Sequence, residues 1–412
     1  MTSPLPTLSR WAVPPAVIAI ALLVYSLATG RSTPAPMILP ESLAPHSVLP
    51  RYNDPRVATD EQLSDVLDRV KPPRTAPLTN NLIHSLRLWG TDADFFDPKV
   101  LSGKQMLGYL TDDAKFREIA GENAPPLLQR TSEGITIRGF EDGTNSRDTS
   151  SYHNDDLLAT YAESGLARDY PLALRDDKAT INDLLATSLR RFHLDRLEYE
   201  WTAITYARYV FPQPMWSNKF GETITLDLLI DELVKAPPEH GPCNGLHRLE
   251  AMTVLCRIDD DLQKLTPKQR MKMLVYMKRV SLLLEQTQSR DGFWSRSWST
   301  GQSSDVDTKS TVYDKILVTG HQIEWLAYAP PEVQPPQETI VRAGQWLCRT
   351  LTELDDKAIV DHYGPYSHAA RALCLWRSTT PYDAWRFGAA GQKARDSQGK
   401  AADSAPAAAT TN

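Results

Sequence analysis

"LLLEQTQSRDGFWSRSW", residues 282–298, is the stretch on which the fold class of this 412-residue chain depends. It takes the end of an apolar helical pattern into a charged turn, with Gly292 at the corner and tryptophans beyond it. The amide of Gln288 can bond backbone groups that neighbouring helix ends leave unpaired, and the ring of Trp294 can shield that amide from water. Gly292 supplies the chain reversal. We therefore interpret the stretch as a joint between helices and not as a reactive site.

Helical patterns fill the chain between residues 59 and 387, where roughly a dozen apolar periodic segments alternate with loops marked by proline and glycine. Only "GITIRGFEDG", residues 134–143, alternates like a strand and ends in a turn signal. The segment "RAGQWLCRTL", residues 342–351, repeats part of the basic, small and large-apolar pattern that precedes Gln288. The sequence therefore predicts an all-α domain of stacked helical hairpins with one short β-hairpin.

The spacing Leu284-x3-Gln288-x3-Gly292-x-Trp294 resembles the "QW" motif of squalene and oxidosqualene cyclases. Similar turns are found across the α/α-toroid proteins, which include terpenoid cyclases and protein prenyltransferase β-subunits. The resemblance implies an α/α toroid of about six helical hairpins. It also implies that the glutamine and the tryptophan have the mechanical role of tying one helix end to the next hairpin.

A second point of resemblance follows the joint, at Asp305-Val306-Asp307-Thr308. Squalene-hopene-type cyclases carry Asp-x-Asp-Asp-Thr at a similar position, and its middle aspartate protonates the polyene. The resemblance implies Asp307 as a catalytic acid with Asp305 beside it, although one of the paired carboxylates is missing here. Both aspartates also suit the capping of a helix that begins near Thr311, and that alternative stays open.

Residues 11–29 carry no charge and lie between Arg10 and Arg31. Such a segment is about long enough to cross a bilayer core of roughly 30 Å. We expect residues 1–30 to be a single-pass transmembrane signal anchor, with a cleaved signal peptide and a secreted chain as the alternative. In both cases the globular part lies outside the cytoplasm. We further expect a Pro/Ser-rich linker at 31–58, the toroid domain at 59–387 and a disordered tail at 388–412.

The spacing His240-x2-Cys243-x3-His247 is compatible with a zinc site. His321 or Asp305 could supply a further ligand. Alternatively, Cys243 is only a small residue in a tight Gly/Pro loop and His247 a hydrogen-bonded wall residue.

A second group of polar residues could line a central cavity. His321 and Glu324 are neighbours on one helix face and could act as an acid–base pair. Capping and ordinary core packing are the alternatives for His153, Asp156 and Trp201. We expect one central cavity to gather the residues His153, Asp156, His240, Cys243, His247, Arg248, His321 and Glu324.

Composition excludes some functions. A net charge of −6 with interleaved signs offers no basic stripe for nucleic acid, and no phosphate loop or hydrolase signature is present.

We predict an exported, membrane-anchored binding or scaffold module for a small-molecule or protein ligand. One alternative is a cyclase-like or prenyltransferase-like enzyme acting on an isoprenoid or lipid, and the other is a carbohydrate-active toroid. An apolar cavity would favour the lipid, and a polar cavity would favour the sugar.

Overall fold

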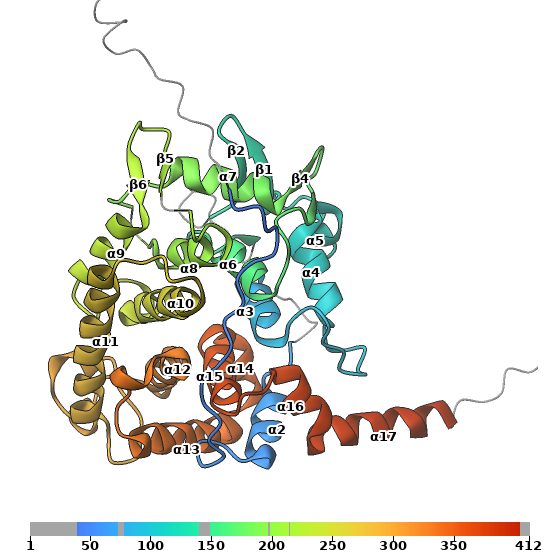
Figure 1. Ribbon diagram of the computed structural model, residues 1–412. Helices are drawn as coiled ribbons and strands as arrows, with labels where there is room; N and C mark the ends of the chain where they lie inside the picture. The colour runs from blue at the N-terminus through green and yellow to red at the C-terminus, as the bar shows by residue number, and fades with distance from the viewer. Residues whose placement is uncertain (1–38, 73–77, 140–148, 197, 214, 404–412) are drawn as a thin grey trace, which may run out of the picture. The chain divides into compact units, whose positions relative to one another are not determined.

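Helices form most of the structure, a computed structural model that describes residues 39–72, 78–139, 149–196, 198–213 and 215–403 (Figure 1). This confirms the prediction of a mostly helical chain that contains short β-hairpin insertions. The predicted anchor at residues 11–29 lies outside the described residues. Among the described helices, none combines the length and the apolar character needed to cross a bilayer.

Six helices are buried on nearly every face, so they lack the exposed polar stripe of a surface helix. Each contacts the next in chain order, and the last contacts the first. We call them the six buried helices: α3 (Thr79–Trp89), α6 (Asp156–Glu163), α8 (Glu200–Tyr209), α10 (Leu246–Leu262), α12 (Val312–Tyr328) and α15 (Tyr363–Trp376).

Amphipathic helices lie between the buried helices in the chain and pack against them. In α13 (Gln337–Glu353), Ile340, Leu347 and Leu351 recur at helical spacing and are buried, whereas Glu338 is exposed. The remaining helices are α2 (Asp60–Arg69), α4 (Gly103–Thr111), α5 (Asp113–Ala120), α7 (Ile181–Arg191), α9 (Leu226–Lys235), α11 (Pro267–Thr287), α14 (Asp356–Asp361), α16 (Pro381–Phe387) and α17 (Ala389–Asp403).

The described residues form three antiparallel hairpins where the sequence predicted one. The predicted strand is β2 (Gly134–Ile137), which pairs with β1 (Leu128–Thr131). The strands of the other two hairpins have three residues each, too short for an alternating pattern to be recognised. These strands are β3 (Pro171–Ala173), β4 (Lys178–Thr180), β5 (Met215–Ser217) and β6 (Thr223–Thr225).

The joint, which we define as Gln288, Gly292 and Trp294, ties the end of α11 to the start of α13 as predicted. The Gln288 amide donates to the carbonyls of Gly292 and Thr339, both at 2.8 Å, and its oxygen accepts from Arg342. The Trp294 indole donates to a carbonyl of α11 at 2.9 Å. Gly292 has a φ of 108°, and a Cβ there would lie 2.3 Å from the Arg342 carbonyl oxygen. Only glycine fits this position.

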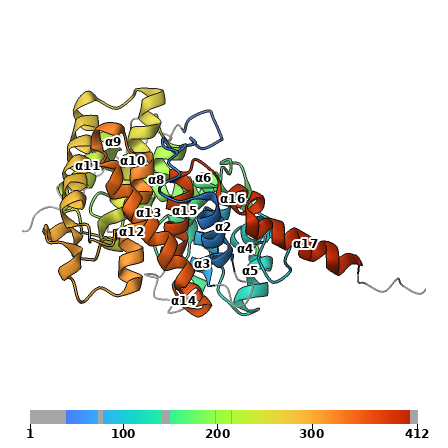
Figure 2. The same ribbon diagram turned by 90° about the horizontal axis from the view of Figure 1, so that it is seen from below.

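Both ends of the helical region are more ordered than their composition suggested. Within the predicted linker, residues 39–54 lie across the carboxyl ends of several buried helices, where His46 N–H bonds the Arg208 carbonyl and Asp54 N–H bonds the Trp376 carbonyl. Within the predicted disordered tail, α17 forms because alanine, lysine and glutamine favour helix and because its first turn bonds Ser64 of α2. Helix α17 projects away from the other helices in both views (Figures 1 and 2).

We predict that Gln288→Ala lowers the free energy of unfolding by about 1–3 kcal/mol, because the substitution leaves two carbonyls and Arg342 without their partner. The measurement is chemical denaturation of the full chain. Gln286→Ala is the matched control, since Gln286 lies on the same helix and is exposed. The control should change stability by less than about 0.5 kcal/mol. Equal midpoints for the two variants would contradict a stabilising role of the joint.

Candidate metal centre

A turn in the left-handed region carries Cys243 to the start of α10. Cys243, Asn244 and Gly245 have φ values of 48°, 56° and 75°. A Cβ at Gly245 would lie 2.0 Å from the Pro238 carbonyl oxygen, so glycine is required there. Two consecutive non-glycine residues in this region are unfavourable, and such strain is typical of functional sites. The turn brings the Cys243 thiol close to His247 in the first turn of α10.

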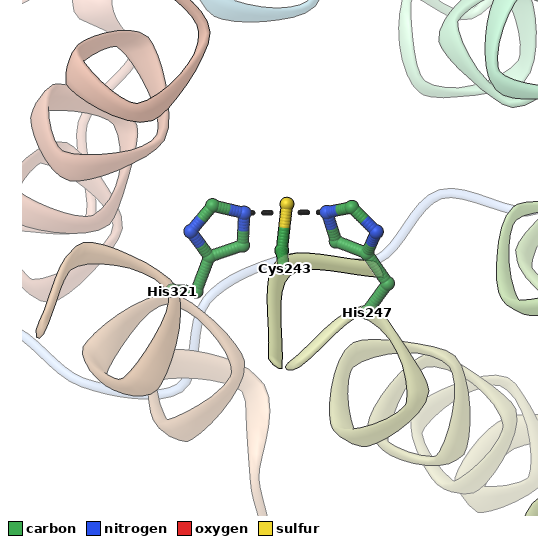
Figure 3. A group of neighbouring side chains, drawn as sticks. All are labelled: Cys243, His247 and His321. Carbon is green, nitrogen blue, oxygen red and sulfur yellow. Dashed lines mark hydrogen bonds between the residues drawn. The ribbon is translucent and has the colours of Figure 1, made fainter. Parts of the chain in front are cut away.

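His247 and His321 face one another across the space between α10 and α12. Their Nε2 atoms lie 3.2 Å apart, and Figure 3 shows the Cys243 sulfur projecting between the two rings. One ligand atom of each of the three residues lies within 4.8 Å of the other two. The Nδ1 of His321 is 2.8 Å from the Leu317 carbonyl oxygen, so Nδ1 carries the proton and Nε2 presents a lone pair. A proton or a metal ion must therefore lie between the two Nε2 atoms.

Other histidines surround this pair, and we call the five rings the histidine cluster. The ring centroid of His368 is 4.1 Å from that of His321 and 5.1 Å from that of His84. His153 meets His247 edge-on at 5.5 Å. The cluster thus gathers five of the nine histidines of the chain.

Burial keeps most of these rings neutral. It lowers the pKa of His84 to about 4 and that of His321 to about 3. Burial, with the neighbouring His321, also holds the pKa of His247 and of His368 well below the usual value. Neutral imidazole is the form that ligates metals. Burial raises the pKa of Cys243 to about 12, so its thiol needs a cation beside it to ionise.

A layer of buried charge lies one helical turn from the histidines, and its centre is Arg371. The guanidinium bonds Glu324 at 2.7 Å, Glu163 at 2.9 Å and Glu250 at 3.2 Å. The second oxygen of Glu324 lies 2.7 Å from His368 Nδ1 and orients that ring. Burial, together with neighbouring carboxylates, raises the pKa of both Glu250 and Glu324.

Arg87 forms the second centre of the same layer. It bonds Asp156, donates to Glu163 at 2.7 Å and stacks over the Trp201 ring at 4.0 Å. The other neighbour of Trp201 is His247, at 4.5 Å between ring centroids. Trp201 thus contacts both the guanidinium of Arg87 and a predicted metal ligand.

A short pattern joins the two layers: a histidine followed three residues later by a charged residue. Residues three apart on a helix share a face, so each copy directs both side chains into the same interior. The pattern occurs on, or at the entry of, five of the six buried helices, as His84/Arg87, His153/Asp156, His247/Glu250, His321/Glu324 and His368/Arg371.

The structure brings together most of the predicted site residues. Cys243, His247, His321 and Glu324 lie in or beside the histidine cluster, as do His153, Asp156 and Trp201. His240 is exposed and does not join the group of potential metal ligands among the described residues. Arg248 is buried but pairs with Glu200 at 3.0 Å, and with His240 it lines a separate cavity of 560 Å³.

Asp305 and Asp307 lie in loop contacts beside the joint. Asp305 accepts from the Arg290 backbone N–H at 3.1 Å. Asp307 accepts from Lys309 and from Ser310. Although burial opposes ionisation, these bonds lower the pKa of Asp307, whereas a general acid needs a raised pKa. The contacts favour a structural role of both aspartates in the loop, but neither caps α12, whose N-cap is Thr311.

A cavity of 450 Å³ reaches the edge of the histidine cluster at His153. His153 and Glu198 both line it and lie 3.1 Å apart. Burial opposes the charged form of His153, but the bond to Glu198 raises the pKa of this ring. Most of the remaining wall is polar, and Phe220 is an exposed aromatic ring at the cavity. The cavity connects solvent to a residue that contacts His247.

We predict that Glu163→Gln lowers the free energy of unfolding by about 3–5 kcal/mol, because it leaves buried guanidinium groups without a carboxylate. Burial alone would raise the pKa of Glu163, but Arg371, Arg87 and Arg208 lower it to about 2. Since the folded pKa is below the unfolded one, this contribution is complete above about pH 4.5 and disappears as the pH falls towards 2.

Urea denaturation at several pH values measures both effects. The wild-type chain should lose stability between about pH 4.5 and 2 more steeply than the Glu163→Gln chain. Glu285→Gln, an exposed position on α11, is the control and should follow the wild type. A Glu163→Gln chain as stable as the control at pH 7 would contradict the proposed role of the carboxylate.

Comparison of the chain with protein-family models, with curated proteins and with solved structures finds no match.

Proposed function

We propose that this protein is an α/α toroid that binds zinc through Cys243, His247 and His321 and uses it in chemistry on a polar substrate. The toroid is supported by the succession of contacts among the six buried helices and by the return contact between α15 and α3. Amphipathic helices alternate with the buried ones along the chain, as an inner and an outer ring require. The recurring histidine–charge pattern further supports a repeated architecture.

The observation that carries the zinc proposal is the geometry of the three donor atoms. Two nitrogens bound to one tetrahedral zinc at its usual bond length lie about 3.3–3.4 Å apart. The His247 and His321 nitrogens are 3.2 Å apart, so a zinc ion could bind both rings with little movement. The Cys243 sulfur is within 4.8 Å of both, and a thiolate with two imidazoles is a donor set typical of zinc.

Three protein ligands favour a catalytic site over a structural one. Zinc with three protein ligands keeps one position open and lowers the pKa of bound water to about 7. His368 and Glu324 form the adjacent hydrogen-bonded pair, in which the carboxyl orients the ring. This pair is placed to exchange protons with a substrate beside His321. Hydrolysis, or addition or removal of water, is the reaction class that these residues support best.

The side chains of the interior and of the cavity beside His153 favour a sugar or another polyhydroxylated substrate over an isoprenoid. Within the part of the chain that the structure describes, imidazole, guanidinium and carboxyl groups occupy the interior in place of the broad apolar wall that a polyene needs. The cavity beside His153 is also mainly polar and has one exposed aromatic ring at its wall, Phe220. A non-catalytic binding module remains the alternative if zinc binds without activity.

We predict one zinc ion per chain after purification of the full-length protein, measured by elemental analysis. Cys243→Ser and His321→Asn should each reduce the bound zinc to well below one ion, because each removes a donor. His240→Asn is the matched control and should keep the metal, since His240 is exposed beside the same turn.

Cobalt substitution tests the ligand set independently of activity. The cobalt-loaded chain should show thiolate-to-metal absorption, and the Cys243→Ser chain should lack it. A wild-type chain without stoichiometric metal, or equal zinc in the Cys243→Ser and His240→Asn chains, would refute the proposed centre.

A further inference from the structure

Helix α11 has two apolar faces, although it lies at the periphery in both views (Figures 1 and 2). One face is buried against the protein and includes Met277 and Leu284. The other consists of Met271, Val275 and Leu282, which are 57 %, 61 % and 48 % exposed. These three residues fall within a narrow arc of the helix because they are four and seven residues apart. A surface helix usually has one apolar face, and a second, exposed one marks a site of interaction.

Basic residues border this exposed stripe. Lys268 and Arg279 are exposed, and neither has an ion-pair partner among the residues that the structure describes. Lys272 is already paired with Asp231 of α9, and Lys278 bonds the Gln334 carbonyl. From Pro267 to Leu284 the helix contains no acidic residue. The rim is therefore positive on a chain whose net charge is −6.

A groove of 500 Å³ follows the stripe between α11 and the end of α9. Val234, Met271, Val275 and Tyr276 form its apolar wall, and basic side chains form its edge. Long basic side chains can extend their charge to a headgroup while their methylene stems and apolar neighbours enter the interface. This combination distinguishes an interfacial helix from an ordinary surface helix.

We infer that this face of α11, defined as Lys268, Met271, Val275, Arg279 and Leu282, binds an anionic lipid surface. The charge of the rim is complementary to acidic headgroups, and the apolar stripe can enter the boundary between headgroups and acyl chains. This inference is independent of the zinc centre, since it uses none of its residues.

The test places an environment-sensitive NBD fluorophore at Val275→Cys in the full chain reconstituted with vesicles. Val306→Cys is the matched control, since Val306 is 64 % exposed and does not belong to α11. The unsubstituted chain, treated in the same way, gives the background from the native cysteines. Vesicles contain phosphatidylcholine alone or with added phosphatidylserine, and a lipid-borne quencher reports contact.

We expect the fluorophore at position 275 to shift to the blue and to be quenched only with phosphatidylserine, and the fluorophore at position 306 to stay unchanged. Lys268→Glu combined with Arg279→Glu should weaken the effect at least about tenfold in lipid titrations, and added salt should weaken it in the wild type. Because both charges are exposed, this variant leaves the core intact.

Three results would overturn the inference. The first is equal quenching at positions 275 and 306. The second is quenching that does not depend on phosphatidylserine. The third is protection of position 275 without lipid, which would assign the face to a protein partner or a second copy.

Discussion

The burial of Arg371 is the constraint on which the interior depends. Moving a guanidinium out of water costs several kcal/mol unless carboxylates and hydrogen bonds offset that cost. Three glutamates do so here, and they come from three other buried helices: Glu163 on α6, Glu250 on α10 and Glu324 on α12. Arg371 of α15 therefore fixes how α6, α10 and α12 are rotated about their axes and where they lie along them. None of these helices can slide without leaving a buried charge unpaired.

This constraint also positions the histidines. His247 lies three residues before Glu250, and His321 lies three residues before Glu324. Because residues three apart share a helix face, the bonds that fix the two carboxyl groups also fix the positions of the two rings. His368 has the same relation to Arg371 on its own helix and is further oriented by Glu324. The facing of His247 and His321 thus follows from the ion pairs below them. The charged layer thus supports the proposed metal centre, and Trp201 packs between the two layers in contact with Arg87 and His247.

The features that could be predicted from sequence are those whose determinants are close together in the chain. The joint could be recognised within residues 282–298, and its residue types predict that Gln288 bonds the ends of neighbouring helices, whereas its partners Thr339 and Arg342 lie outside this stretch. The nearness of Cys243 to His247 could be predicted from their spacing, but the exclusion of exposed His240 depends on the left-handed turn. The hairpins β3–β4 and β5–β6 could not be predicted, because strands of three residues are too short to show a periodic pattern.

His84 and His368 were not predicted as site residues, because neither belongs to a metal-ligand spacing in the sequence. Their partners come from distant helices, so no local pattern reveals the contacts. The signal available was the recurrence of a histidine three residues before a charged residue on successive helices. Arg371 and Glu250 belong to the same recurrence, whereas Glu163 could have been found only because acidic and basic residues in otherwise apolar helices must pair when buried.

Residues 39–54 impose an order on folding during synthesis. This segment leaves the ribosome before any of the helices that it contacts, and its bond from Asp54 to Trp376 must wait for α15. Pro40, Pro45 and Pro50 favour an extended chain and remove backbone donors, so the waiting segment is a poor partner for other strands. The prolines that give this region the composition of a linker therefore protect it from mispairing until the last buried helix is made.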